Sequence, residues 1–320
     1  MTTWVIRLDG AFSRNNVLAI IIRPAHLMEH YQATVVIPLL NQQDAWLEGC
    51  VRSALEQSVS TQVVVITSPR TCDSNLAVLR ELARNARNLA VREQDRDGFA
   101  RAINCGFALS SCSRVGLLLS DDWLAPTAVE KCLPRNVDIV STSLAGYAAD
   151  GKTLLDCVSS DLKESVYDRL PTLEEKADYL SHFFLFRKSK LEEIGGVDEA
   201  LPEDVPGLDD YDMIWALLER GATVSIVEER LYCYRDHELL RRTLQAHRLQ
   251  SAGFGRILDK HGVIGRERER LLASHRQWFG KTIQVVQAEI AEAQPRRRVR
   301  KAIRAVVQRI KRLVEPESPV

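Results

Sequence analysis

The chain of 320 residues lacks any apolar run long enough for a membrane span or a secretory signal. The longest such run near its start is the stretch Val17–Ile22. A membrane span needs about 20 apolar residues, and a signal peptide needs about 7 to 15 followed by a cleavage site. We therefore expect neither a transmembrane nor a secreted protein, but a cytoplasmic one.

Recognisable metal and phosphate motifs are also missing. The 7 cysteines include no CxxC pair, and the 7 histidines include no HExxH. Such spacings mark zinc sites, so none is predicted, and an odd number of scattered cysteines is typical of free thiols in a reducing compartment. The first clear strand is followed by Leu39–Gln42 and not by a glycine-rich phosphate loop, which argues against a nucleotidyltransferase that forms sugar nucleotides.

The net charge is zero, and the composition is that of a globular protein, with 45% hydrophobic and 27% charged residues. The neutrality hides a basic tail, because nine Lys and Arg residues and no acid lie between Arg296 and Arg312. Apolar residues recur there at helical spacing, so 296–314 is predicted to form a basic amphipathic helix. Such a helix can lie on the anionic inner face of a membrane. It can also pack on the acidic body of the chain or join a second copy in an oligomer. Nucleic acid is not expected, since the tail has no interleaved aromatics.

Short buried strands alternate with helices over 33–238. This pattern predicts an α/β fold with a mixed, mostly parallel sheet flanked by helices, preceded by an N-terminal extension (1–32) and followed by a helical C-terminal region (239–320). Ligands of such sheets bind beyond the carboxyl ends of the strands. Strands are predicted over 33–40, 63–66, 89–92, 115–119, 138–142, 183–187 and 223–227, and helices over 45–57, 76–87, 99–109, 173–180, 191–194 and 213–220.

Two groups of acids could carry chemistry. Asp121 and Asp122 directly follow a buried strand, where neighbouring carboxylates can hold Mg²⁺ or Mn²⁺, although aspartates can also merely end a strand. Asp209, Asp210 and Asp212 precede a helix. Acids suit the start of a helix, where they can cap it, and a carboxylate can also serve as a general base.

Five blocks of the sequence, in order, resemble family 2 glycosyltransferases of the GT-A fold. The resemblance covers about 33–237, or about two thirds of the chain, and includes a stretch similar to the family's D-x-G … A-x-N-x-G pattern. The blocks are Ala33–Asn41 with Trp46–Gln57, Asp97–Gly106, Leu117–Leu124, His182–Glu199 with Asp210–Gly221, and Arg230–His237.

The resemblance implies transfer of a sugar, with inversion, from a nucleoside-diphosphate donor to an acceptor hydroxyl, on a glycan or a lipid carrier, in bacterial surface polysaccharide synthesis. Asp210 matches the catalytic base. Asp122, Asp121 and His237 match positions for a Mg²⁺ or Mn²⁺ ion that neutralises the diphosphate, and Asp121 also matches a donor contact; an exposed loop residue is the alternative for His237. The remaining positions on the donor side are Pro38, Asn41, Thr67, Asp97 and Asn104.

The chain also departs from the family. The second strand ends in Ile66–Pro69, whereas relatives carry acids that contact the nucleobase there, so only a hydroxyl such as that of Thr67 remains for this contact. Arg101 replaces an acid, and it either pairs with diphosphate or is an exposed helical residue. Two hypotheses therefore stand: an active glycosyltransferase, or a GT-A module without activity that binds a glycan or a partner. Metal-dependent binding of a nucleotide sugar would favour the enzyme.

Overall fold

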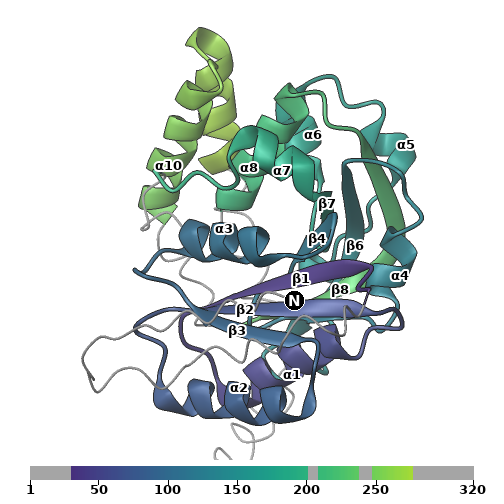
Figure 1. Ribbon diagram of the computed structural model, residues 1–320. Helices are drawn as coiled ribbons and strands as arrows, with labels where there is room; N and C mark the ends of the chain where they lie inside the picture. Colours follow the sequence, from purple (N-terminus) through teal and green to yellow (C-terminus); the bar gives the residue numbers. More distant parts are fainter. Residues whose placement is uncertain (1–29, 201–207, 238–246, 277–320) are drawn as a thin grey trace, which may run out of the picture.

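The computed structural model describes residues 30–200, 208–237 and 247–276. Its centre is a mixed sheet of 8 strands in the order β3-β2-β1-β4-β7-β6-β8-β5. This arrangement confirms the predicted α/β class, with helices on both faces of the sheet (Figure 1). The strands are β1 (Ala33–Leu39), β2 (Thr61–Thr67), β3 (Leu89–Glu93), β4 (Arg114–Leu117), β5 (Trp123–Leu124), β6 (Ile139–Ala148), β7 (Phe184–Arg187) and β8 (Val224–Asp236).

Alternation of side chains along the strands builds one core on each face of the sheet. In β1, Val35 and Ile37 belong to one core and Val36 to the other, and all three are fully buried. The first core contains α1 (Asp44–Leu55), α2 (Asp73–Asn85) and α4 (Ala128–Cys132). The second contains α3 (Phe99–Leu109), α6 (Leu173–Tyr179), α7 (Lys188–Ile194) and α8 (Asp209–Glu219).

The first half of the sheet is parallel, which brings several loops to one edge. β1 pairs in parallel with both β2 and β4, and β2 with β3. Because the carboxyl ends of parallel strands lie at the same edge, the segments after Leu39, Thr67 and Leu117 lie near one another. The candidate donor and metal residues come from these segments.

The second half of the sheet is mixed, with a parallel pair, β6 and β8, among antiparallel ones. β7 pairs with both β4 and β6, and the two-residue strand β5 pairs with β8. β8 is longer than predicted, since it continues from Val224 through Asp236 beside β6. The pairing of Trp123 with Cys233 therefore carries the acids that precede β5 to the end of β8.

C-terminal helices pack against α8 in the second core. α10 (His247–Lys260) contributes Phe254, Ile257 and Leu258, and a further helix spans 265–276. Gly262, in the turn between them, and Gly265, at the start of the second helix, both have positive φ, and breaks were predicted near these residues. Among the described residues, no helix is both long and apolar enough to cross a bilayer. Most of the predicted N-terminal extension and the whole basic tail, 296–314, lie outside the described residues.

Candidate active site

Asp121 and Asp122 lie in the turn between β4 and β5 and are almost fully buried. Asp122 accepts two hydrogen bonds of 2.6 Å from β8, one from the Tyr232 hydroxyl to Oδ2 and one from the Arg235 N–H to Oδ1. Burial and the neighbouring charge of Asp121 raise the pKa of Asp122, and the two hydrogen bonds act against that rise. The acids thus do more than end a strand, because they join the β4–β5 turn to the end of β8.

His237 meets Asp121 at the end of β8. Its Nε2 lies 3.1 Å from Asp121 Oδ2, and its ring centroid lies 4.6 Å from that of Trp46 in α1. The interpretation of His237 as an exposed loop residue is wrong, since it is only 5% exposed. The tertiary structure thus places an imidazole nitrogen beside a carboxylate oxygen.

Arg235 packs its guanidinium between two indoles, 4.9 Å from the ring centroid of Trp46 and 4.8 Å from that of Trp123. Its Nε donates to the Asp121 carbonyl oxygen at 2.9 Å. These cation–π contacts fix a positive charge beside the two buried carboxylates. The charge partly offsets the repulsion between Asp121 and Asp122.

Asp210 lies in the first turn of α8 and faces the same group of residues. Its Oδ2 is 2.8 Å from His182 Nε2, and its Oδ1 accepts from the Tyr211 N–H at 2.9 Å. The His182 ring stacks on Tyr232, with 5.3 Å between centroids. Burial would raise the pKa of Asp210, but the hydrogen bond and the charge interaction with His182, followed by the hydrogen bond from the Tyr211 N–H, outweigh it, and the pKa is lowered.

The two other acids of α8 have different surroundings. Burial, followed by the charge of Asp210, raises the pKa of Asp209 to about 7. Asp212 is bonded to Lys260 at 2.7 Å and to His261 at 3.0 Å, both at the end of α10. The N-cap residue of α8 is Leu208, which makes no side-chain capping bond, and the three acids instead lie in the first turn, where Asp210 accepts the N–H of Tyr211.

On the donor side, the predicted residues mainly hold loops together. Asn41 donates to the Arg70 carbonyl oxygen at 3.2 Å and accepts from the Cys72 N–H at 2.7 Å. Asp97 accepts from the Ser68 hydroxyl and is paired with Arg70. Thr67 and Pro38 lie in the paired, buried parts of β2 and β1. In this structure a serine and an arginine of the loop after β2, Ser68 and Arg70, contact Asp97.

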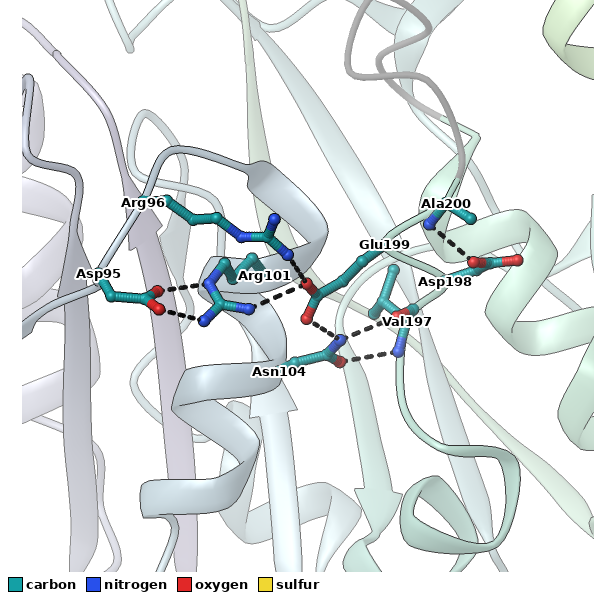
Figure 2. A network of polar contacts seen from close by, with 8 residues as sticks. All are labelled: Asp95, Arg96, Arg101, Asn104, Val197, Asp198, Glu199 and Ala200. Carbon is teal, nitrogen blue, oxygen red and sulfur yellow. Dashed lines mark hydrogen bonds and ion pairs between the residues drawn. The ribbon is translucent and has the colours of Figure 1, made fainter.

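Asn104 joins α3 to the segment that follows α7. Its side-chain nitrogen donates to the Val197 carbonyl oxygen at 2.8 Å, and its oxygen accepts from the Val197 N–H at 2.8 Å. Figure 2 shows that the Glu199 carboxylate accepts hydrogen bonds from the side chains of Arg96, Arg101 and Asn104. Arg101 also pairs with Asp95, and its side chain is only 25% exposed, so it is an ion-paired residue of α3 and not an exposed one.

A polar cavity of about 590 Å³ lies between the end of α7, α8 and the end of α10. Its lining includes Asn104, Asp212, Lys260 and His261, but not Asp121, Asp122 or Asp210. The cavity is therefore separate from the group of residues around Tyr232.

The atoms that meet at Asp121 are of the kinds that bind a divalent cation. A buried carboxylate and an imidazole nitrogen converge there, and Mn²⁺ accepts both ligand types. Among the described residues, no three His, Cys, Asp or Glu side chains form a complete metal-binding group. The pair of Asp121 and His237 therefore fits part of a coordination shell, since two protein ligands leave the other positions of a divalent ion to water or substrate oxygens.

Sequence reasoning assigned no role to His182, Tyr232 or Arg235, which hold the site together. His182 directly precedes an apolar strand, and Tyr232 and Arg235 lie in the last motif block. A polar or aromatic residue at the end of a buried strand is the sequence feature that could have indicated their role. Their partners, however, are 28 to 113 positions away in the chain.

Comparison of folds defines the class. The structure resembles the mannosyltransferase PcManGT from Pyrobaculum calidifontis, solved with GDP-Man and Mn²⁺, at a TM-score of 0.55 and 16% identity over 86% of this chain and 81% of that one. It also resembles S. aureus TarS (residues 1–349) solved with UDP-GlcNAc, at a TM-score of 0.50 and 18% identity over 69% and 66% of the two chains. The fold is therefore the GT-A fold of glycosyltransferases.

The family model described as glycosyl transferase family 2 matches residues 34–195. The chain belongs to this family. It is 26% identical over 219 residues to the O-antigen biosynthesis protein RfbC of Myxococcus xanthus, covering 66% of this chain and 16% of that protein. It is 27% identical over 205 residues to a chondroitin synthase of Pasteurella multocida, covering 62% and 20%. The chain thus spans only a fifth or less of the length of these relatives.

Proposed function

We propose that the protein transfers a sugar from a nucleoside-diphosphate donor to an acceptor hydroxyl, with inversion, in the synthesis of a surface polysaccharide. One observation carries this proposal. Asp210 contacts His182, which stacks on Tyr232, and the Tyr232 hydroxyl donates to Asp122. A carboxylate able to act as a base therefore lies two side chains away from the acidic group at the end of β4.

In this reaction, Asp210 accepts the proton of the acceptor hydroxyl. The acceptor oxygen forms a bond to the anomeric carbon while the bond from that carbon to the diphosphate oxygen breaks, and the diphosphate leaves with the electron pair. Attack from the face opposite the leaving group inverts the anomeric centre. Because its pKa is lowered, Asp210 is ionised at neutral pH and ready to accept the proton.

Asp121 and His237 would hold a divalent cation, Mg²⁺ or Mn²⁺, which neutralises charge on the departing diphosphate when bound. Asp122 is held by Tyr232 and Arg235, so it would orient the turn and support Asp121. The Mn²⁺ in the mannosyltransferase of the same fold supports a metal-dependent reaction. The names of the sequence relatives support a glycan acceptor.

A screen of UDP-, GDP- and dTDP-sugars with Mn²⁺ tests this proposal by measuring donor hydrolysis and transfer to glycan acceptors. Asp210→Asn should lower transfer by about 100-fold or more, because it removes the base, and it should retain donor binding. Asp209→Asn is the matched control, because it makes the same change one position away and should retain transfer. Donor binding without turnover in the unmodified protein would favour the binding module, and full activity of Asp210→Asn would refute the base.

A further inference from the structure

His182 lies just before β7, between the candidate base and the acidic group. Its Nε2 is 2.8 Å from Asp210 Oδ2, and 17% of its side chain is exposed. Its ring stacks on Tyr232 at an interplanar angle of 28° and meets the Phe184 ring edge-on at 4.7 Å between centroids. Two aromatic contacts therefore fix the plane of the imidazole, and with it the direction of the Nε2 bond.

The second ring nitrogen of His182 decides where its proton lies. Nδ1 is buried and has no hydrogen-bond partner in the part of the chain that the structure describes. A buried N–H without a partner costs about 1–3 kcal/mol, so the form with the proton on Nε2 is favoured. Of the two neutral tautomers, the one with its N–H on Nε2 therefore donates to Asp210.

We propose that His182 is a positioning residue for Asp210, which its Nε2–H holds in the orientation that accepts the proton of the acceptor hydroxyl. This inference rests on the proposed function. It gives a role to His182, which lies in a motif block but has no role from the motif blocks or the comparisons. The hydrogen bond from His182 stabilises the charged form of the Asp210 carboxylate. The stacked rings of His182 and Tyr232 separate this carboxylate from Asp122. A change in the Asp210 rotamer would misalign the proton transfer, and misplacement by about 1 Å can cost about 100-fold in rate.

Of the other ionisable groups on and around α8, Asp209 is the neighbour whose pKa the charge of Asp210 raises, and several others have partners of their own. Asp209 and Asp212 share the first turn of the helix with Asp210. Lys260, the last residue of α10, and His261, which follows it, pair with Asp212. From α6, Glu174 faces the Tyr211 hydroxyl at 3.4 Å. From β8, Tyr232 directs its hydroxyl to Asp122. His182 is thus the partner through which the tertiary structure acts on the Asp210 carboxylate.

Three variants separate positioning from packing. His182→Phe keeps an aromatic ring for the stack on Tyr232 but removes the donor. His182→Gln restores an N–H donor without the ring. His261→Phe is the matched control, because His261 also stacks on an aromatic ring, that of Trp215, and bonds an aspartate of α8.

For His182→Phe we expect kcat to fall by about 10- to 100-fold with the KM for the nucleotide sugar unchanged. Without the hydrogen-bond donor, the ionised form of Asp210 is less stable and its pKa rises. The acidic limb of the kcat–pH profile should therefore move to higher pH. His182→Gln should recover most of the lost rate and return the limb toward its original position. His261→Phe should leave the pH profile unmoved, even where it lowers thermal stability.

The ¹³C titration of the Asp210 carboxyl, assigned by its loss in Asp210→Asn, gives a readout that does not depend on turnover. It should move to higher pH in His182→Phe and return in His182→Gln. An active unmodified protein whose His182→Phe variant keeps both kcat and the carboxyl titration would overturn the positioning role alone. An unmodified protein that transfers no sugar from any donor would instead overturn the proposed function, and the positioning role with it.

Discussion

Asp209→Asn should change how the stability of the protein depends on pH. Burial raises the pKa of Asp209 to about 7 in the folded chain, from an ordinary value of 3.8. Folding therefore favours the protonated form, and the ionised carboxylate destabilises the native state as the pH rises from 4 toward 7. The difference between these two pKa values corresponds to a destabilisation on the order of 4 kcal/mol above pH 7. An amide of the same shape carries no charge at any of these pH values.

Urea unfolding at several pH values between 4 and 8, followed by circular dichroism, measures this effect. The free energy of unfolding of Asp209→Asn should exceed that of the unmodified protein by an amount that grows up to pH 7 and then stays constant. The gain should approach the few kcal/mol given above, which is a large part of the stability of a typical domain.

Asp73→Asn provides the control, because Asp73 lies in the first turn of α2 just as Asp209 lies in that of α8, but is exposed. Its stability curve should run parallel to that of the unmodified protein. If the unfolding free energies of Asp209→Asn and the unmodified protein also run parallel from pH 4 to 8, burial does not raise the pKa of Asp209.

Three further substitutions test the packing around the site by urea unfolding. Gly106→Ala should cost about 1–3 kcal/mol, because a Cβ there would lie 2.1 Å from Val36 Cγ1 and push α3 off the sheet; unchanged stability would contradict this close packing. Tyr232→Phe keeps the ring but removes the donor to buried Asp122, for an expected loss of about 1.5–3 kcal/mol, and a neutral result would show that this hydrogen bond contributes little. Asn104→Ala should cost about 1–3 kcal/mol and increase amide exchange in the segment after α7, which it holds; unaltered exchange would argue against that link.

Local pattern accounts for most of the secondary structure. The helix predicted over 99–109 has these limits in the structure, and the strand predicted over 89–92 extends by a single residue. Two strands run further than predicted: β6 was predicted to end at 142 and reaches Ala148, and β8 was predicted to end at 227 and reaches Asp236. Charged residues interrupt the apolar pattern of β8 at Glu228 and Glu229, and pairing with β6 carries the strand across this interruption.

The roles of the acids could be predicted only in outline. The position of Asp121 and Asp122 after a buried strand indicated a site, and the motif blocks pointed to Asp210. Contact with His182, which lowers the pKa of Asp210 while that of Asp209 is raised by burial, has no signature in the local sequence around these neighbouring acids. The same limit applies to Asn104, whose partners lie 93 to 95 positions further along the chain.

The sequence by itself determined the alternation of strands and helices, the parallel first half of the sheet, and the edge at which acidic residues collect. These features depend on periodicity and on strand direction, which act over a few neighbouring positions. Only the tertiary structure decided that Tyr232 meets Asp122 across 110 positions and that His182 turns its Nε2 toward Asp210. Such contacts depend on how β5 and β8 pair and how α8 packs, since the free energy of one hydrogen bond is too small to fix them without that framework.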